Sequence, residues 1–356
     1  MSDTTPGFVC AHHHLYSTLA RGMPSPPNTP KDFIGVLENV WWRLDAALDD
    51  EMIYWSAKLG AVEALMAGTT CIIDHHESPN AISGSLALIT QACNEVGVRV
   101  NASYGVTDRW TDTGSIRQHV KPAEEMTAAA RAGLEENRRH LASGGRGMVG
   151  VHASFTATDD TLVAAANLAH EFGVGVHIHV AEGPDDAGAH SRLAELATEK
   201  WLIVHGVHLR QALKGTLVHN PRSNMNNAVG YAHPTRLGMP IALGTDGIGA
   251  DMPEEARVAF ARLRESDLTA GADTVGRWLD TGRLLFPEAN DDVVTWNYDR
   301  MDSAWHLAYT TGTRPHTVVV DGKTVLSDGR PTLVDLDEVR HHASLQAKRL
   351  HERLAA

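Results

Sequence analysis

Cysteine, positive charge and long apolar runs are all scarce in this sequence of 356 residues. The three cysteines, Cys10, Cys71 and Cys93, match neither a disulfide framework nor a Cys-x-x-Cys metal motif. We expect them to be buried thiols in a reducing cytoplasm. No apolar run approaches the roughly 18 residues of a membrane span, and residues 1–7 lack the pattern of a signal peptide. The sequence therefore predicts a soluble, cytoplasmic protein with no membrane partner.

Basic residues are too few and too dispersed for a nucleic-acid-binding surface. The chain has 31 Lys and Arg against 44 Asp and Glu, which gives a formal net charge of −13 at pH 7. A protein that binds a phosphate backbone is expected to carry a basic stripe, and none is visible in this sequence. The Cys-containing signature of nucleic-acid deaminases is also missing. We therefore expect no nucleic-acid partner. The simplest role of the negative charge is to keep the protein soluble.

The sequence does contain eight short apolar runs that alternate with helical periodicities. Continuous Val, Ile and Leu runs are typical of parallel strands that are covered on both faces. Strands that alternate with helices indicate a parallel sheet, and eight such units predict an α/β fold of the (β/α)8, TIM-barrel type. The predicted strands are Phe8–His14, Thr69–Asp74, Val98–Tyr104, Met148–His152, Val174–His179, Leu202–His205, Thr216–His219 and Pro240–Asp246. The predicted helices between them are Asp32–Leu48, Glu51–Ala67, Ser83–Val96, Ala123–Ala142, Asp159–Phe172 and Ser191–Lys200.

The pattern changes after the eighth run. Two more helices are predicted, followed by two or three short strands and a closing amphipathic helix at Leu336–Leu354. We therefore predict a barrel domain at residues 1–290 and a small β remnant with a C-terminal helix at residues 291–356. The additional elements are the helices Glu254–Glu265 and Thr274–Leu285 and the strands Val293–Tyr298, Thr317–Val320 and Thr324–Leu326.

Seven of the eight predicted strands end in histidine or aspartate. An α/β barrel places its chemistry at the carboxyl ends of its strands, so residues distant in sequence can converge on one ion. The pattern is typical of a metallohydrolase. The residues that end these runs are His12 and His14, Asp74, His152, His179, His205, His219 and Asp246.

Side-chain alternation selects candidate ligands among these residues. His12 and His14 lie on the same face of their strand, and two imidazoles at a strand end suit zinc or iron. A lone His-x-His is weak evidence of a metal site, however. His179 also ends a strand, and Asp246 supplies a carboxylate. Such a set leaves room for a water, whose pKa a metal lowers to about 7. His177 lies one layer deeper than His179, where a hydrogen-bonded core histidine is expected.

Several motifs carry a resemblance to a known family. Pro6–His14, His179–Glu182, Val204–Gly206 and Gly244–Gly247 look like the amidohydrolase superfamily, in its cytosine-deaminase-like branch. The resemblance extends over residues 6–265. Four longer motifs resemble most closely the SsnA family of aminohydrolases: Trp41–Asp45, Asp74–Pro79, His219–Asn227 and Asp246–Met252.

The resemblance implies a ligand set and a mechanism. One divalent metal, with zinc first and iron second, would be bound by His12, His14, His179 and Asp246. Binuclear members have a bridging Lys or carboxylate at the end of the fourth strand, where this chain has Val151-His152-Ala153. A single ion is therefore expected. Glu182 would move protons, His205 would polarise the substrate or hold the oxyanion, and Asp246 would act as both ligand and base.

The implied function is that of a metal-dependent aminohydrolase. A metal-bound hydroxide would break a C–N bond of a small nitrogen heterocycle, such as a purine, pterin, pyrimidine or triazine. The same residues could also serve a chlorohydrolase or a cyclic amide hydrolase. A ligand-binding barrel without turnover is the alternative of a different class.

Six further residues are candidate substrate contacts. His152 is expected to face the substrate, and Arg109 either clamps an anionic or carbonyl group or lies on the surface. One of His75 and its neighbour His76 should face the pocket. Loop residues Arg222 and Asn224 either bond a heterocycle or satisfy their own backbone. Trp42 or its neighbour Trp41 should stack on a flat substrate, with at least one of the two in the core.

The small domain is expected to be reduced. Relatives carry a longer segment before the first strand, and this segment pairs with C-terminal strands, whereas only Met1–Thr5 precede the first motif here. Unpaired strand edges need a cover, since exposed edges invite pairing. Either Leu336–Leu354 or a second subunit would supply it. We favour a two-fold homodimer, which is the commonest closed assembly.

Overall fold

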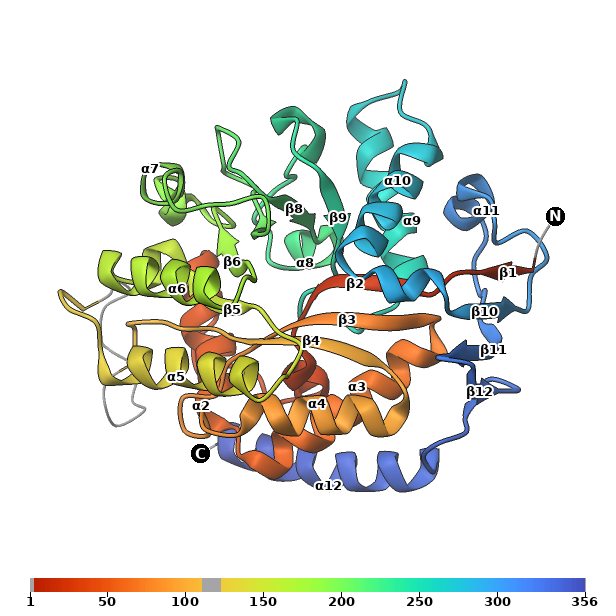
Figure 1. Cartoon of the computed structure of the whole chain (residues 1–356), viewed down its shortest axis with the longest axis horizontal. Coiled ribbons are helices and arrows are strands. Elements are labelled where there is room, and N and C mark those ends of the chain that lie inside the picture. Colours follow the sequence, from red (N-terminus) through yellow and green to blue (C-terminus); the bar gives the residue numbers. More distant parts are fainter. Residues whose placement is uncertain (1–2, 111–122, 356) are drawn as a thin grey trace.

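Eight parallel strands form the centre of the molecule, and helices surround them (Figure 1). The computed structural model describes residues 3–110 and 123–355. All eight predicted strands are confirmed, with ends that shift by up to three residues. They are β2 (Phe8–His13), β3 (Thr69–His76), β4 (Arg99–Tyr104), β5 (Val149–Ala153), β6 (Val176–Val180), β7 (Leu202–His205), β8 (Thr216–His219) and β9 (Ile241–Leu243).

The strands close into a barrel. Strands β2 to β4 form one parallel ladder and β5 to β9 form another. Isolated parallel bridges join the two ladders on both sides, between Val106 and Val151 and between His13 and Asp246. Six of the eight strands are buried at every residue, as expected for parallel strands between two layers. The predicted TIM-like barrel is thus confirmed.

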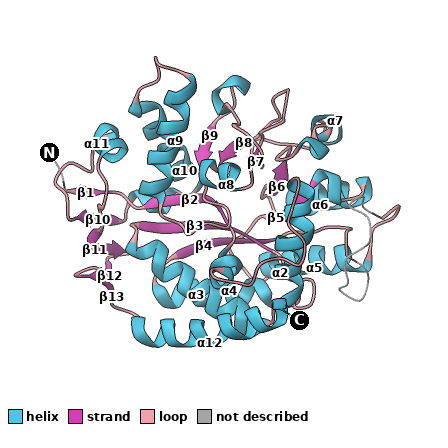
Figure 2. Cartoon of the chain, turned by 180° about the vertical axis from the view of Figure 1, so that it is seen from behind, coloured by secondary structure: helices cyan, strands magenta, loops and turns pink. Residues whose placement is uncertain are grey.

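Helices cover the outside of the barrel (Figure 2). Many begin at a side chain that caps the first turn: Asp49 accepts a hydrogen bond from the Met52 amide, and Thr158 accepts one from the Thr161 amide. Most predicted helices are confirmed, with ends that shift by up to five residues, the largest shift being at the start of α5 (predicted Ala123, observed Ala128). The main helices are α3 (Asp50–Met66), α4 (Ser85–Val96), α5 (Ala128–Ala142), α6 (Asp159–Glu171), α9 (Met252–Ser266) and α10 (Ala272–Leu285).

Two helix predictions need correction. The predicted helix Asp32–Leu48 consists of α1 (Phe33–Val36), a π-helical turn η2 (Leu37–Trp41) and α2 (Trp42–Ala47). The predicted helix Ser191–Lys200 is wrong over most of its length, because α7 covers only Ala189–Leu193. The short α8 (Pro221–Asn226) follows β8. This helix begins with Pro221, and the first turn of a helix is a position that proline favours.

The small sheet is larger than predicted. It has five antiparallel strands in the order β1-β10-β11-β12-β13. The expectation that no N-terminal residues pair with it was wrong, because Thr4 and Thr5 pair with Thr295 and Val294. A two-residue strand gives no periodicity that could be seen in the sequence. The strands are β1 (Thr4–Thr5), β10 (Val293–Trp296), β11 (Pro315–Val320), β12 (Lys323–Ser327) and β13 (Arg330–Pro331).

The C-terminal helix α12 (Leu336–Ala355) packs along the barrel's first crossover, on α2, α3 and the 3-10 helix η1 (Leu15–Ala20). Arg349 and Arg353 both pair with Asp49, and the His342 ring stacks on Trp55. In Figure 1, α12 runs along the lower edge of the molecule, beneath α3. The region predicted as a second domain therefore contacts the barrel extensively, and β1 from the first region joins its sheet.

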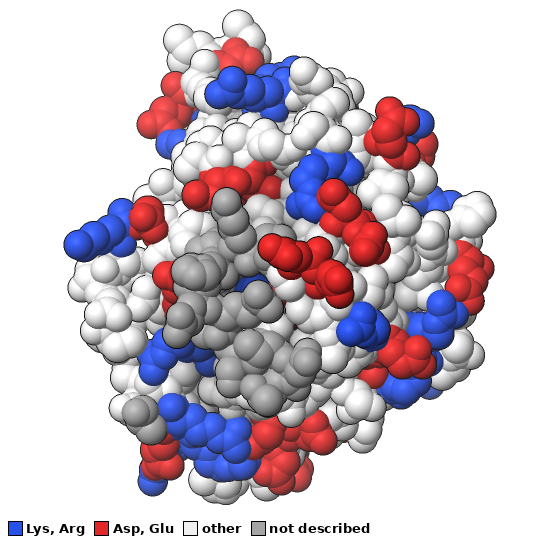
Figure 3. All heavy atoms as spheres, turned by 90° about the vertical axis from the view of Figure 1, so that its left-hand side faces the viewer, with Lys and Arg blue, Asp and Glu red and all other residues white. Residues whose placement is uncertain are grey.

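The surface and the thiols fit the composition. None of the described helices is long and apolar enough to cross a membrane. On the face shown in Figure 3, the described Lys and Arg side chains are scattered among Asp and Glu, without a basic patch. The three cysteines are buried and unpaired, as predicted.

Candidate metal centre

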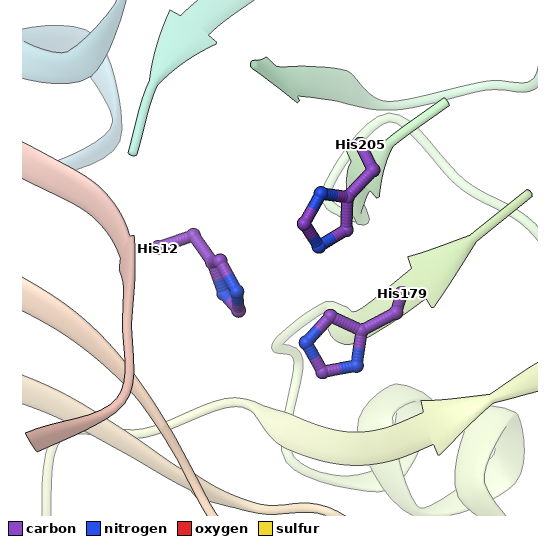
Figure 4. A group of neighbouring side chains, drawn as sticks. All are labelled: His12, His179 and His205. Carbon is purple, nitrogen blue, oxygen red and sulfur yellow. The ribbon is translucent and has the colours of Figure 1, made fainter. Parts of the chain in front are cut away.

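The carboxyl ends of β2, β6 and β9 bring the four predicted ligands together. Nε2 of His14 lies 3.3 Å from Nε2 of His179 and 3.0 Å from Oδ1 of Asp246. Nε2 of His12 lies 3.8 Å from the same carboxylate oxygen. In Figure 4 the rings of His12, His179 and His205 face a common space. Overlapping triads of these residues have ligand atoms within 4.8 Å of one another, which is close enough to share one ion.

Shifts in strand register help to aim these side chains. Between Cys10 and His13, β2 contains one residue more than its partner β3. Such a bulge changes the direction in which a side chain points. Here Ala11 lies in an apolar cluster inside the barrel, and the next residue, His12, faces the candidate ligand Asp246. A second shift lies between Val151 and Ala153 in β5, beside His179 of β6. Strict alternation along a strand therefore does not describe the mouth of this barrel.

Two of the histidines are fixed in one tautomer by backbone carbonyls. Nδ1 of His14 donates to the carbonyl of His75, and Nδ1 of His179 donates to the carbonyl of His152. In the neutral imidazole, each Nε2 is then left with a lone pair. Metal-ligating histidines typically donate their other ring N–H in this way. The 3.3 Å between the two Nε2 atoms suits two ligands of one ion.

His12 is fixed by a chain of side chains. Ser103 Oγ donates to the carbonyl of Asp74, so it can only accept from Nδ1 of His177. His177 Nε2 must then accept from Nδ1 of His12, 2.8 Å away. Nε2 of His12 is consequently a lone pair; it is buried and has no hydrogen-bond partner among the described residues. His177 is thus a hydrogen-bonded core residue, as the sequence indicated, and it sets the tautomer of a ligand.

The electrostatics of His12, His179 and Asp246 also fit a metal, whereas, despite burial, the contact with Asp246 raises the pKa of His14 to about 9. Burial lowers the pKa of His12 and His179 well below the ordinary value for histidine, which keeps both imidazoles neutral. Despite burial, contacts with His12 and His14 hold the pKa of Asp246 well below its usual range. Ser223 Oγ and the Gly247 amide also donate to this carboxylate. Three imidazoles and one carboxylate are a donor set that zinc accepts, so the residues present fit a zinc-class ion.

Glu182 and His205 lie next to the ligands. Nε2 of His205 is 3.3 Å from Oε2 of Glu182 and 3.7 Å from Oδ2 of Asp246. Burial raises the pKa of Glu182 above its ordinary value, while the nearby His205 opposes this shift. A carboxyl group with a raised pKa is suited to taking up and releasing protons. Nδ1 of His205 bonds Oδ1 of Asn224, which orients the ring.

Three residues at this mouth hold a left-handed backbone conformation. Ala181, His205 and Asp246 have φ angles of 49°, 70° and 54°. Non-glycine residues rarely adopt positive φ, and such strain clusters at functional sites. All three follow or end a strand of the barrel. The backbone is therefore bent at the points where it presents the ligands and the residues beside them.

A cavity of about 550 Å³, counted with its open mouth, lies over this centre. No Lys or Arg is among the described residues that line it. The lining residues are His14, Tyr16, Phe33, Leu37, Trp41, Asp45, Glu77, His152, Ala153, Phe155, His179, Glu182, Asp186, Asn227 and Asp246.

The candidate substrate contacts divide into those in the cavity and those outside it. His152 lines the cavity, and its Nδ1 is 2.8 Å from Oγ1 of Thr156. Trp41 lines it as well, whereas Trp42 is buried behind it. His75 is buried beneath the ligands, with its ring 4.6 Å from that of His179. Of these, only His152 and Trp41 are placed to touch a substrate directly.

The two candidate arginines are both committed to carboxylates. Arg109 is fully buried and its Nη2 contacts Asp45 and Glu77, at 2.8 and 2.7 Å. Arg222 pairs with the buried Glu255. Neither lines the cavity. The expected clamp on an anionic or carbonyl group therefore has no support in this geometry, and the surface alternative for Arg109 was wrong.

Sequence reasoning missed Asp45 and Glu77 as cavity residues. Both belong to motifs that carried the family resemblance, Trp41–Asp45 and Asp74–Pro79. Those motifs were the only indication in the sequence that the two residues belong to the site. No pattern in the sequence indicated that the two carboxylates share one arginine.

Comparisons with known proteins agree with this geometry. Residues 4–279 match the model of the Amidohydrolase family. A 5-methylthioadenosine/S-adenosylhomocysteine deaminase of Desulforudis audaxviator is 28% identical, over 98% of this chain and 87% of its own length. A 5'-deoxyadenosine deaminase of Methanococcus maripaludis is 26% identical, over 94% of this chain and 85% of its own.

Solved structures share the fold over nearly the whole chain. An adenosine deaminase from Xanthomonas campestris with bound zinc has a TM-score of 0.79 at 21% identity, over 98% of this chain and 86% of its own. An atrazine chlorohydrolase from Arthrobacter aurescens, complexed with zinc, has a TM-score of 0.77 at 18% identity, over 97% and 88%.

Proposed function

The chain belongs to the amidohydrolase family, and we propose that it is a zinc-class deaminase that removes the ring amino group of a purine nucleoside. Two observations support this proposal. His12, His14, His179 and Asp246 offer a ligand set for one ion, with Glu182 and His205 beside it. The relatives that align with nearly the whole of this chain are named as deaminases of adenosine derivatives. We place the chain near the SsnA family because of the motifs at Trp41–Asp45 and His219–Asn227.

The reaction adds water across a C–N bond and expels ammonia. A bound zinc-class ion would supply Lewis acidity and lower the pKa of a water. Oε2 of Glu182 is placed to pass one proton of the attacking water to the ring nitrogen, and then to pass the second proton, from the hydroxyl group formed on the attacked carbon, to the leaving amine. The amino-bearing carbon thereby gains oxygen and loses nitrogen, and the ring becomes a lactam.

His205 and Asp246 support this proton movement. With Nδ1 of His205 held by Asn224, its Nε2 faces both Glu182 and Asp246. His205 can stabilise negative charge on the attacked carbon's oxygen when it carries a proton at Nε2. Asp246 can accept a proton through Oδ2. Trp41 and Phe155 line the cavity with aromatic surface suited to a flat ring.

The observation that carries the proposal is the convergence of His12, His14, His179 and Asp246 on one space, with Glu182 and His205 beside it. The experiment is release of ammonia by protein loaded with zinc, measured over adenosine, 5'-deoxyadenosine, 5'-methylthioadenosine, pterins, pyrimidines and triazines. Deamination of at least one adenosine derivative is expected. Release of chloride from a chlorotriazine without any deamination would favour the chlorohydrolase alternative, and no turnover by a metal-loaded protein would favour a ligand-binding barrel.

We further propose a cytoplasmic homodimer. Exposed apolar side chains gather where α9, α10 and the short helix α11 (Ala304–Tyr309) meet, among them Trp305 and Tyr309, 46% and 66% exposed. Apolar surface of this kind is often buried between subunits. Light scattering at micromolar concentration should give twice the chain mass. A monomer would remove the dimer from the proposal without affecting the chemistry.

A further inference from the structure

Asp45 and Glu77 form an acidic wall of the cavity that the proposed chemistry does not use. Asp45 lies in α2 and Glu77 follows β3 directly. Both line the cavity, although only 1% and 2% of their surfaces are exposed. Neither belongs to any group of described residues close enough to share an ion with the ligands. The acidic wall is therefore available to the part of a substrate that does not react.

The charge of the acidic wall is only partly balanced. One guanidinium, that of Arg109, serves both carboxylates through Nη2. Its carbon lies 4.5 Å from the Trp42 ring centre and 4.8 Å from that of Trp110, so aromatic rings hold it behind the wall. Two carboxylates against one cation leave an excess negative charge or a proton. Burial, together with repulsion from Glu77, raises the pKa of Asp45 well above its ordinary value.

Asp45 also has an unused acceptor. Its Oδ2 accepts from Arg109, while Oδ1 is buried and accepts no hydrogen bond of normal geometry from the described residues. The Tyr16 hydroxyl interacts with the carboxyl group but does not satisfy Oδ1. By contrast, Oε1 of Glu77 forms an ion pair with Arg109 and accepts a hydrogen bond from the indole N–H of Trp110. An unsatisfied buried acceptor destabilises the protein, and a donor on the substrate would remove this penalty.

The third acidic side chain of the wall region is already satisfied. Asp186 accepts hydrogen bonds from Ser154 Oγ and from the Ala181 amide. Glu182 and Asp246 are engaged in the metal centre. Asp45 is therefore the carboxylate of the cavity that is free to bind a substrate donor.

We propose that Asp45, backed by Glu77 and Arg109, selects substrates whose non-reacting part carries a hydrogen-bond donor and no negative charge. The inference rests on the proposed function and narrows it to uncharged or cationic nucleosides. An ammonium or hydroxyl group can donate to Oδ1, and it stabilises the ionised carboxylate. A carboxylate or phosphate at that place lies against two carboxyl groups that share one guanidinium, with no cationic side chain among the described lining residues to pair with it. When both carboxyl groups are ionised, they and the single guanidinium carry a net negative charge, which repels an anion.

A charge series of three nucleosides tests the proposal. The compounds are 5'-amino-5'-deoxyadenosine, adenosine and adenosine-5'-carboxylic acid, which differ at a single position. We expect kcat/KM to fall in that order, with the carboxylic acid at least roughly 100-fold below adenosine because of like-charge repulsion. In Asp45→Asn the penalty on the carboxylic acid should shrink at least roughly tenfold, mainly through KM. Asp49→Asn is the matched control, because Asp49 pairs with Arg349 and Arg353 outside the cavity and should leave the series unchanged.

The outcomes separate this inference from the proposed function. Calorimetric binding of the same three compounds to the zinc-loaded protein is measured alongside turnover. If none is deaminated, the proposed function fails, and the order of binding affinities then decides the inference. Equal affinities, a preference for the carboxylic acid, or no binding of any compound would overturn it. If Asp45→Asn does not fold, Glu77→Gln should reduce the penalty on the carboxylic acid in the same way. The order of the three compounds with the wild-type protein also tests the inference without any variant.

Discussion

The metal centre and the acidic wall are two parts of one cavity that the chain builds in different ways. The ligands come from the ends of β2, β6 and β9, where strand pairing fixes the backbone on both sides. The acidic wall comes from α2 and from the residue after β3, and its geometry depends on an arginine from a third loop. The roles proposed above therefore place the chemistry on residues at the strand ends and the specificity on residues of the crossovers.

The largest effect is expected from removing the carboxylate ligand. Asp246→Ala should lose the metal and lower kcat/KM at least roughly 10³-fold, because several kcal/mol of transition-state stabilisation depend on the ion. Metal content by elemental analysis and turnover should fall together. Full zinc occupancy in this variant would show that the centre does not depend on Asp246.

Glu182→Gln should separate chemistry from metal binding. The variant keeps the hydrogen-bonding shape but cannot carry the proton, so kcat should fall at least roughly 10²-fold while zinc stays bound. Glu199→Gln, on an exposed part of the same region, is the matched control and should behave like wild type. Loss of zinc would make Glu182 a ligand, and unchanged turnover would remove it from the mechanism.

His177→Phe tests the hydrogen-bond chain behind the metal centre. Without an acceptor for Nδ1, the His12 ring loses its fixed tautomer, and zinc affinity should fall roughly 10- to 100-fold. Competition with a chelator measures the affinity directly and is independent of turnover. Excess zinc should restore most of the activity. Wild-type affinity in a folded His177→Phe protein would contradict a role for this chain.

Arg222→Gln should have the smallest effect on turnover. Arg222 pairs with Glu255 outside the cavity, so kcat/KM should change by less than about threefold, or under 1 kcal/mol. Thermal stability should fall, because the buried Glu255 loses its partner. A large rise in KM with unchanged stability would place Arg222 at the substrate after all.

The strands and the residues that converge at their ends could be predicted because their signals are local. A buried strand appears as an apolar run, and a candidate ligand appears as a polar residue at its end, as with His179 in β6. The register of parallel pairing then determines which strand ends meet. Shifts such as the one beside His12 preserved this result without being visible in the sequence.

Other features could not be predicted because they depend on distant partners. Arg109 pairs with Asp45, 64 residues away, and nothing near either residue indicates the contact. An arginine in a loop has the same local sequence whether it faces a substrate or a carboxylate. Strand β1 was missed for a different reason, since Thr4–Thr5 is too short to show alternation.

Anomalous diffraction at the zinc edge, from crystals of protein purified without chelator, would locate the metal ion itself. We predict one peak per chain, coordinated by Nε2 of His12, His14 and His179 and by the carboxylate of Asp246. Two peaks, or one peak placed among His14, His75 and His179 without Asp246, would contradict it, as would coordination by His205 in place of His179.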